Sequence, residues 1–144
     1  MRSQDHPVWT WILAVLALGT LANAAWMLID PLRWYHDLPA AVPDFGPFNP
    51  HFVRDIGCAF ATAGIALAWA ARRPEWRVPL VGTAAVFFVA HAILHVHDIL
   101  RGLVDSHHWW IDFPGVMFPA IATSALAIHF QRQASRVSSP EQSG

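Results

Sequence analysis

His91, His95 and Asp98 are the residues of this chain best placed to do chemistry. They occupy positions i, i+4 and i+7 in the run His91-Ala-Ile-Leu-His95-Val-His97-Asp98, so a helix through this run puts all three on one face. Two histidines four residues apart are the spacing by which a helix presents two imidazoles to one metal ion. The segment around them is apolar, and ionisable groups inside such a segment are costly and therefore candidates for a functional site.

A second pair of candidate ligands, His51 and Asp55, opens the preceding apolar segment at the same i, i+4 spacing. A short charged turn joins the two segments, so we expect antiparallel neighbours, and a helical rise of about 1.5 Å per residue puts Asp55 and His95 at matching depth. Imidazole and carboxylate groups together suit Zn, Fe, Cu or Mn. The sequence therefore predicts a metal site whose ligands are His51, Asp55, His91, His95 and Asp98.

Other interpretations of these residues stay open at this point. The same side chains could form a structural network of ion pairs with Arg54 and Arg101, since charges within a membrane commonly pair in this way. A proton relay, a quinone pocket or haem b is a further alternative, and haem would need histidines on opposite sides of the iron. His107 and His108, with two tryptophans after them, are expected to anchor a loop at the lipid headgroups, or alternatively to form a lid.

The elements that must position these ligands are four apolar segments. The chain has 144 residues, 55% of them hydrophobic and only 13% charged, about half the charged fraction of a soluble domain. Residues 9–29, 52–71, 78–100 and 113–130 form the apolar segments, and each reaches or approaches the roughly 20 residues that cross a bilayer as a helix. The sequence predicts an all-α, four-transmembrane-helix bundle with antiparallel up-down topology, a single domain over residues 1–134 and a polar tail over 135–144.

The connections and the single cysteine add constraints. Residues 31–50 contain several prolines, which argue against a helix there, and this loop is long enough to fold over the site. Pro119 is expected to kink the fourth span. Cys58 stands alone, which excludes an internal disulfide and a cysteine-based metal cluster. The first span could instead be a signal peptide, but its apolar stretch is longer than a typical signal sequence has.

The distribution of arginine predicts the orientation in the membrane. One side carries Arg2, Arg72, Arg73, Arg77, Arg132 and Arg136, and the other carries Arg33, Arg54 and Arg101. The positive-inside rule then places both termini in the cytoplasm, with tryptophans at both membrane interfaces. We therefore expect a protein of the bacterial inner membrane whose polar site faces the periplasm or the exterior.

The start of the second span carries a resemblance to a known family. The stretch Asn49-Pro50-His51-Phe52-Val53-Arg54-Asp55-Ile56-Gly57 resembles the second helix of DoxX-like small four-helix membrane proteins, in which an arginine and a glycine recur at this place. The resemblance implies the four-span fold and a redox-linked or quinone-associated membrane subunit. The run from His91 to Asp98 departs from the family's general pattern and indicates a specialised role.

Three classes of function are compatible with these observations. The first is a metal-dependent oxidoreductase or hydrolase at the outer leaflet, where the metal would activate water or polarise a substrate oxygen. The second is a non-enzymatic accessory subunit of a larger membrane complex, or a homo-oligomer, in which the polar cluster is structural. The third, a transporter or proton channel, is disfavoured because three of the spans have no ionisable residue near the centre. The lipid bilayer is the expected surrounding, and the net charge of -1 indicates no nucleic-acid partner.

Overall fold

The computed structural model describes residues 7–138, and within this range the chain forms helices and no strand. The long helices are α1 (Pro7–Ile29), α3 (Pro50–Arg72), α4 (Arg77–Leu100) and α6 (Phe118–Ser138). The short ones are α2 (Pro31–Asp37), η1 (Val42–Phe45), η2 (Pro74–Trp76), α5 (His108–Ile111) and the π-helical turn η3 (Phe113–Met117). Arg2 and residues 139–144 of the predicted tail lie outside the described residues, whereas residues 135–138 belong to α6.

Four stretches of the described chain are long and apolar enough to cross a membrane, namely Pro7–Ile29, Pro50–Arg72, Pro74–Leu100 and Phe113–Arg136. The predicted all-helical protein with four membrane-length helices is thus confirmed. A minority of the residues in each stretch are buried inside the protein, so most of their apolar side chains face outward. Such a surface is suited to lipid rather than to water.

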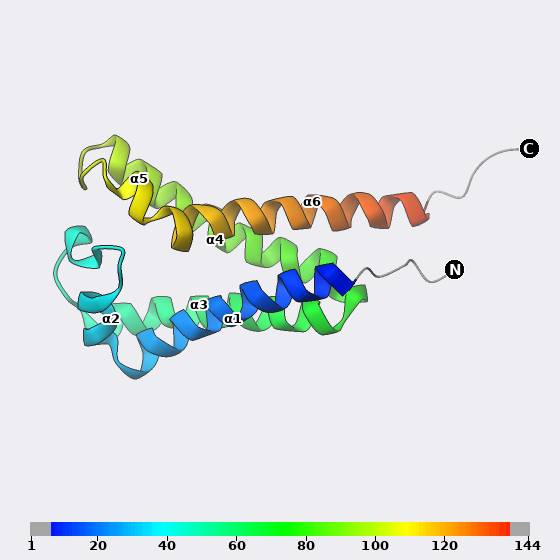
Figure 1. Cartoon of the computed structure of the whole chain (residues 1–144), viewed down its shortest axis with the longest axis horizontal. Helices are drawn as coiled ribbons and strands as arrows, with labels where there is room; N and C mark the ends of the chain where they lie inside the picture. The colour runs from blue at the N-terminus through cyan, green and yellow to red at the C-terminus, as the bar shows by residue number, and fades with distance from the viewer. Residues whose placement is uncertain (1–6, 139–144) are drawn as a thin grey trace, which may run out of the picture.

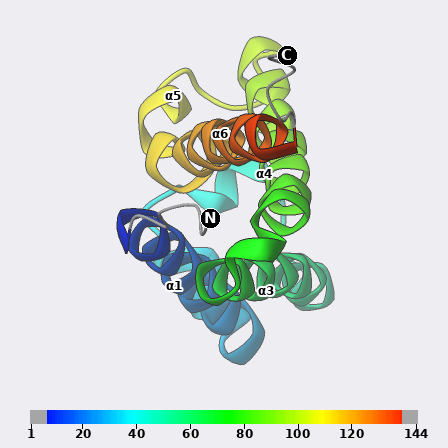
Figure 2. The same ribbon diagram turned by 90° about the vertical axis from the view of Figure 1, so that its right-hand side faces the viewer.

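The long helices form two pairs that run side by side. Figure 1 shows α1 with α3 in one pair and α4 with α6 in the other, and the chain reverses its direction from each long helix to the next. We call the end at which α1 begins and α6 ends the terminal end, and the opposite end, which holds α2, η1 and α5, the loop end. Seen from the terminal end, the segment after α2 lies behind and between the two pairs (Figure 2).

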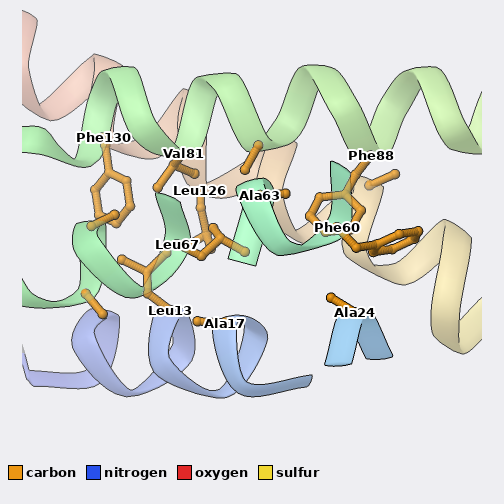
Figure 3. Close-up of a cluster of buried hydrophobic side chains, with 14 of the residues drawn as sticks. Leu13, Ala17, Ala24, Phe60, Ala63, Leu67, Val81, Phe88, Leu126 and Phe130 are labelled. Atoms are coloured by element: carbon orange, nitrogen blue, oxygen red, sulfur yellow. The ribbon is translucent and has the colours of Figure 1, made fainter. Parts of the chain in front are cut away.

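The core between the helices is apolar and closely packed. Leu13, Leu67, Val81 and Phe88, one or more from three of the long helices, are almost completely buried and point toward one another in Figure 3. Within the α1/α3 pair, the two backbones approach closely at Gly64, where a Cβ atom would lie 2.7 Å from Cγ of Leu21. Small residues let transmembrane helices approach closely, and Gly64 has this role between α1 and α3.

A buried arginine ties the helices together at the terminal end. The Nε group of Arg77, at the start of α4, donates a hydrogen bond to the Ala70 carbonyl at 3.3 Å, and its Nη2 group donates to the Thr10 hydroxyl at 3.0 Å. The guanidinium also lies over the Phe130 ring, 5.3 Å from its centroid. One side chain thus links α4 to α1, α3 and α6.

The helical content of the loop end differs from the sequence prediction. The expectation that prolines exclude helix from residues 31–50 is wrong, because α2 begins with Pro31 at its first position, where the missing N–H costs nothing. The Asp30 carboxylate caps this helix by accepting from the Arg33 backbone N–H at 3.2 Å. Pro119 is the second residue of α6, where the first helical turn tolerates proline, and the π-helical turn η3, which contains Pro114, directly precedes α6. The kink expected at Pro119 stays a prediction.

Candidate metal centre

The polar cluster of the loop end is built around Asp112. Its carboxylate is fully buried, and Oδ2 lies 2.8 Å from Nδ1 of His95 on α4. Both carboxylate oxygens lie 3.2 Å from Nδ1 of His108 on α5. Because an ionised carboxylate only accepts hydrogen bonds, both ring nitrogens donate to it. Asp112 therefore fixes the orientation of two imidazoles and leaves Nε2 of each one without this partner.

Local backbone structure explains why Asp112 can occupy this position. Asp112 follows directly after α5, and its carbonyl accepts from the N–H groups of Val116 at 2.8 Å and Met117 at 3.4 Å. The second of these bonds, from i+5 to i, defines the π-helical turn, and such turns are frequent at functional sites. The spacing of four residues from His108 to Asp112 puts the two side chains on the same side of the chain. The backbone hydrogen bonds of η3 thus hold the buried Asp112 carboxylate beside His95 of α4.

The other nitrogen of His108 faces a second carboxylate. Nε2 lies 3.3 Å from Oδ2 of Asp44, which belongs to η1. A neutral imidazole carries one N–H, and that of His108 is used on Asp112, so Nε2 and the Asp44 oxygen would present two lone pairs to each other. This contact is favourable when a second proton or a metal cation lies between the two atoms.

His107, like His108, has its Nδ1 at a carboxylate, but it lies at the surface. Its Nδ1 lies 3.0 Å from Oδ1 of Asp105, and the same oxygen accepts from the His107 backbone N–H at 2.8 Å. These hydrogen bonds from His107, the backbone one foremost, lower the pKa of the exposed Asp105 carboxyl below its ordinary value. The His107 ring lies 4.7 Å from that of His108. Two adjacent histidines therefore each have Nδ1 held by a carboxylate.

One oxygen of Asp44 and one nitrogen from each of His107 and His108 come within 4.8 Å of one another, and they are the one set of three or more such donors among residues 7–138. Histidines that bind a metal almost always donate their other N–H to a carboxylate or a carbonyl, and Nδ1 of both His107 and His108 lies at a carboxylate. Two imidazoles and one carboxylate are the ligands of catalytic zinc sites and of the iron sites that keep open coordination positions. Asp44 and His107 are exposed, so an open position would be reached from outside the bundle.

The segment that carries Asp44 crosses from one helix pair to the other. Phe45 packs against the rings of His95 and His108, with centroids 4.7 and 4.9 Å apart. The Tyr35 hydroxyl, on α2, donates to the Gly46 carbonyl at 2.6 Å. The expectation that the proline-rich loop lies over the polar site agrees with this placement, and the loop also supplies a candidate ligand.

The structure separates the five residues that the sequence predicts as ligands. His91 and His95 stay together on α4, with ring centroids 4.7 Å apart, and His95 belongs to the Asp112 cluster. His51 and Asp55 form their own pair at 3.3 Å, with side chains 88% and 60% exposed on α3.

Asp98, the fifth predicted ligand, lies 3.1 Å from Nδ1 of its neighbour His97. The group of three donors within 4.8 Å contains none of the five predicted residues. The two sets share one link, because His95 and His108 both bind Asp112.

A signal for part of the observed cluster was present in the sequence. His108 and Asp112 stand at i, i+4, the same spacing that singled out His51 and Asp55. Applied to the third connection, this rule would have flagged a held imidazole instead of a headgroup anchor, and His108 is in fact fully buried. Nothing comparable marks Asp44, which is 64 residues away from His108 along the chain.

No protein-family model matches the chain, and no curated protein or solved structure matches it either.

Proposed function

We propose that this protein is a small membrane protein that binds one divalent transition metal at its loop end, through Asp44, His107 and His108. The observation that carries the proposal is that both ring nitrogens of His108 lie at carboxylates. Nδ1 is held by Asp112, and Nε2 lies 3.3 Å from the Asp44 carboxylate. A metal ion at this place would bind Nε2 and the carboxylate together and remove the conflict between their lone pairs. A structural imidazolium between two aspartates is the alternative.

The charges of the cluster support a cation. The ion-pair partners of the buried Asp112 among the described residues are His95 and His108, and no arginine is among them. With neutral imidazoles, the buried Asp112 would keep a negative charge without a partner of opposite sign, and the exposed Asp44 lies on the other side of the His108 ring. Buried charges need a partner of opposite sign or a metal, and a divalent ion supplies the matching charge.

The three ligands would leave coordination positions for water or substrate, because zinc and iron bind four to six ligands. Zinc in this setting would activate a bound water, and iron would support oxidation. The activity we propose is therefore metal-dependent hydrolysis or redox chemistry at the membrane surface, and the identity of the metal decides between them. A non-enzymatic subunit of a larger membrane complex is the competing function.

The proposed orientation places the metal outside the cell. Arg72, Arg73, Arg77, Arg132 and Arg136 lie at the terminal end, whereas Arg33, Arg54 and Arg101 lie at the loop end. By the positive-inside rule the terminal end faces the cytoplasm. In a bacterial inner membrane the loop end would face the periplasm, and the likeness to DoxX-like proteins is in keeping with this four-helix arrangement.

Elemental analysis of the detergent-purified protein, combined with a visible absorption spectrum, tests the proposal. We expect about one metal ion per chain in the wild type. The metal content should fall strongly in His107→Ala and in Asp44→Asn. Both of these residues are exposed, so the substitutions spare the core. His51→Ala is the matched control, an exposed histidine of the same end, and it should retain the metal.

Each other result has a defined meaning. Metal lost in His51→Ala and kept in His107→Ala would restore the ligand set predicted from the sequence. A Soret band would replace the metal site with haem. Protein that stays metal-free after growth with added zinc, iron, copper and manganese would contradict the proposal and favour the structural imidazolium.

A further inference from the structure

A second candidate site lies at the opposite end of the molecule, between α1 and α3. A hollow of about 340 Å³ is lined by Leu21 from α1 and, from α3 and the residue after it, by Ile65, Ala68, Trp69, Arg72 and Arg73. Its lining is mainly apolar from Ile65 to Trp69, and two arginines stand where α3 ends. We propose that this hollow binds one anionic phospholipid, with an acyl chain along the helices and the phosphate between the two arginines.

The shape of the hollow follows from the helix packing. Gly64 lets α1 approach α3 beside Leu21. Ala68, one turn after Gly64, also has a small side chain, so little of α3 projects into the hollow on this side. Ile65 and Trp69 rise beside it at i, i+4 spacing and are 57% and 53% exposed. The result is a shallow apolar channel along the outside of the α1/α3 pair, which a hydrocarbon chain fits better than water does.

The charge at the end of the channel selects the headgroup. Arg72 donates one hydrogen bond from Nη1 to the Ala68 carbonyl at 3.2 Å, and a guanidinium carries five N–H groups in all. Arginine binds phosphate with two parallel hydrogen bonds, and basic pockets between transmembrane helices bind anionic lipid headgroups. Trp69, one turn before Arg73, is a residue type enriched at the level of the headgroups.

One acidic residue competes for this phosphate. The Glu75 carboxylate lies 3.8 Å from Nη1 of Arg73, with both side chains more than half exposed. An exposed pair at this distance is weak, so a phosphate can displace it. We therefore expect Glu75→Gln to strengthen lipid binding, which separates this site from a general attraction to the positive end of the protein.

Binding of dioleoyl phosphatidylglycerol and dioleoyl phosphatidylcholine to the full-length, detergent-purified protein, measured by native mass spectrometry, tests the proposal. We expect the wild type to prefer the anionic lipid roughly tenfold, since each basic residue near the headgroups adds severalfold. The preference should disappear in Arg72→Gln/Arg73→Gln. The matched control is Arg132→Gln/Arg136→Gln, which removes two exposed arginines of the same end from α6 and should leave the preference unchanged.

An equal loss in the control variant, or an unchanged preference in Arg72→Gln/Arg73→Gln, would overturn the proposal. Binding of soluble glycerol phosphate as strongly as of the lipid would also overturn it, because the channel would then contribute nothing. If the double variant does not fold, Ile65→Trp is the second test. Filling the channel should weaken binding of both lipids, and undiminished binding would count against the site.

Discussion

The two ends of the bundle are held together by different chemistry. At the terminal end the Arg77 guanidinium, 3% exposed, reaches three neighbouring helices through two hydrogen bonds and one aromatic ring. At the loop end the link between the helix pairs passes through Asp44 and Phe45, which contact His95 and His108. One end is joined by a cation that the chain supplies itself, and the other by an Asp44–His108 contact that a shared proton or a metal ion would make favourable.

This difference indicates which end can respond to its surroundings. An arginine keeps its charge at every relevant pH, so the contact at the terminal end is permanent. The contact between Asp44 and His108 becomes favourable when a proton or a metal ion joins the two atoms. We therefore expect the loop end to tighten when metal is bound and the terminal end to be indifferent to it.

The largest effect in this comparison should come from Arg77→Ala. The substitution removes two hydrogen bonds from a charged donor and a ring contact, and we expect a loss of about 2–4 kcal/mol in the free energy of unfolding. Thermal unfolding in detergent, with and without a chelator, measures it. The loss should be equal in both conditions, and a loss confined to the metal-loaded protein would break the distinction between the two ends.

A smaller effect, confined to the loop end, is expected from Asp112→Asn. An amide keeps one acceptor oxygen and presents an NH2 donor in place of the other, so it cannot accept from His95 and His108 as the carboxylate does, and their orientation is held less firmly. Loss of a carboxylate that supports a metal-binding histidine costs 10–100-fold in metal affinity. Titration of metal-free protein with zinc measures this change.

Asp55→Asn is the matched control for this titration. Asp55 is an exposed aspartate of the same end, paired with His51 alone among the contacts described for it. The control variant should bind zinc as the wild type does. Equal affinities of Asp112→Asn and wild type would remove Asp112 from the site.

The sequence was sufficient for the long helices because apolar length is a local property. The segments at 9–29, 52–71, 78–100 and 113–130 all fall within the observed membrane-length stretches. The helix that begins at Pro31 was not predicted, because the prolines of this loop argue against helix, whereas a proline is excluded from the interior of a helix and not from its first turn.

The candidate metal centre could be predicted only in part, because its geometry depends on which way each helix is turned. In segments that are apolar on all sides, periodicity fixes this rotation poorly. The sequence therefore does not determine whether α3 turns His51 and Asp55 toward α4. In the structure both side chains are exposed. Asp44 reaches His108 through the path of a loop, which no spacing rule records.

The smallest expected effect concerns Asp105, at the outer edge of the loop end. The hydrogen bonds from His107 lower the pKa of this carboxyl below its ordinary value of 3.8, so the folded state favours its ionised form. The stabilisation is complete above the ordinary pKa and is lost as the pH falls through the lowered one. Asp105→Asn should remove this component of the acid dependence of unfolding, and the change should be slight because the group is exposed.

Unfolding followed between about pH 5 and pH 3 with a chelator present measures it, with Asp37→Asn, another exposed aspartate of this end, as the control. A change of the same size in both variants would show that the hydrogen bonds from His107 contribute nothing to holding the loop end.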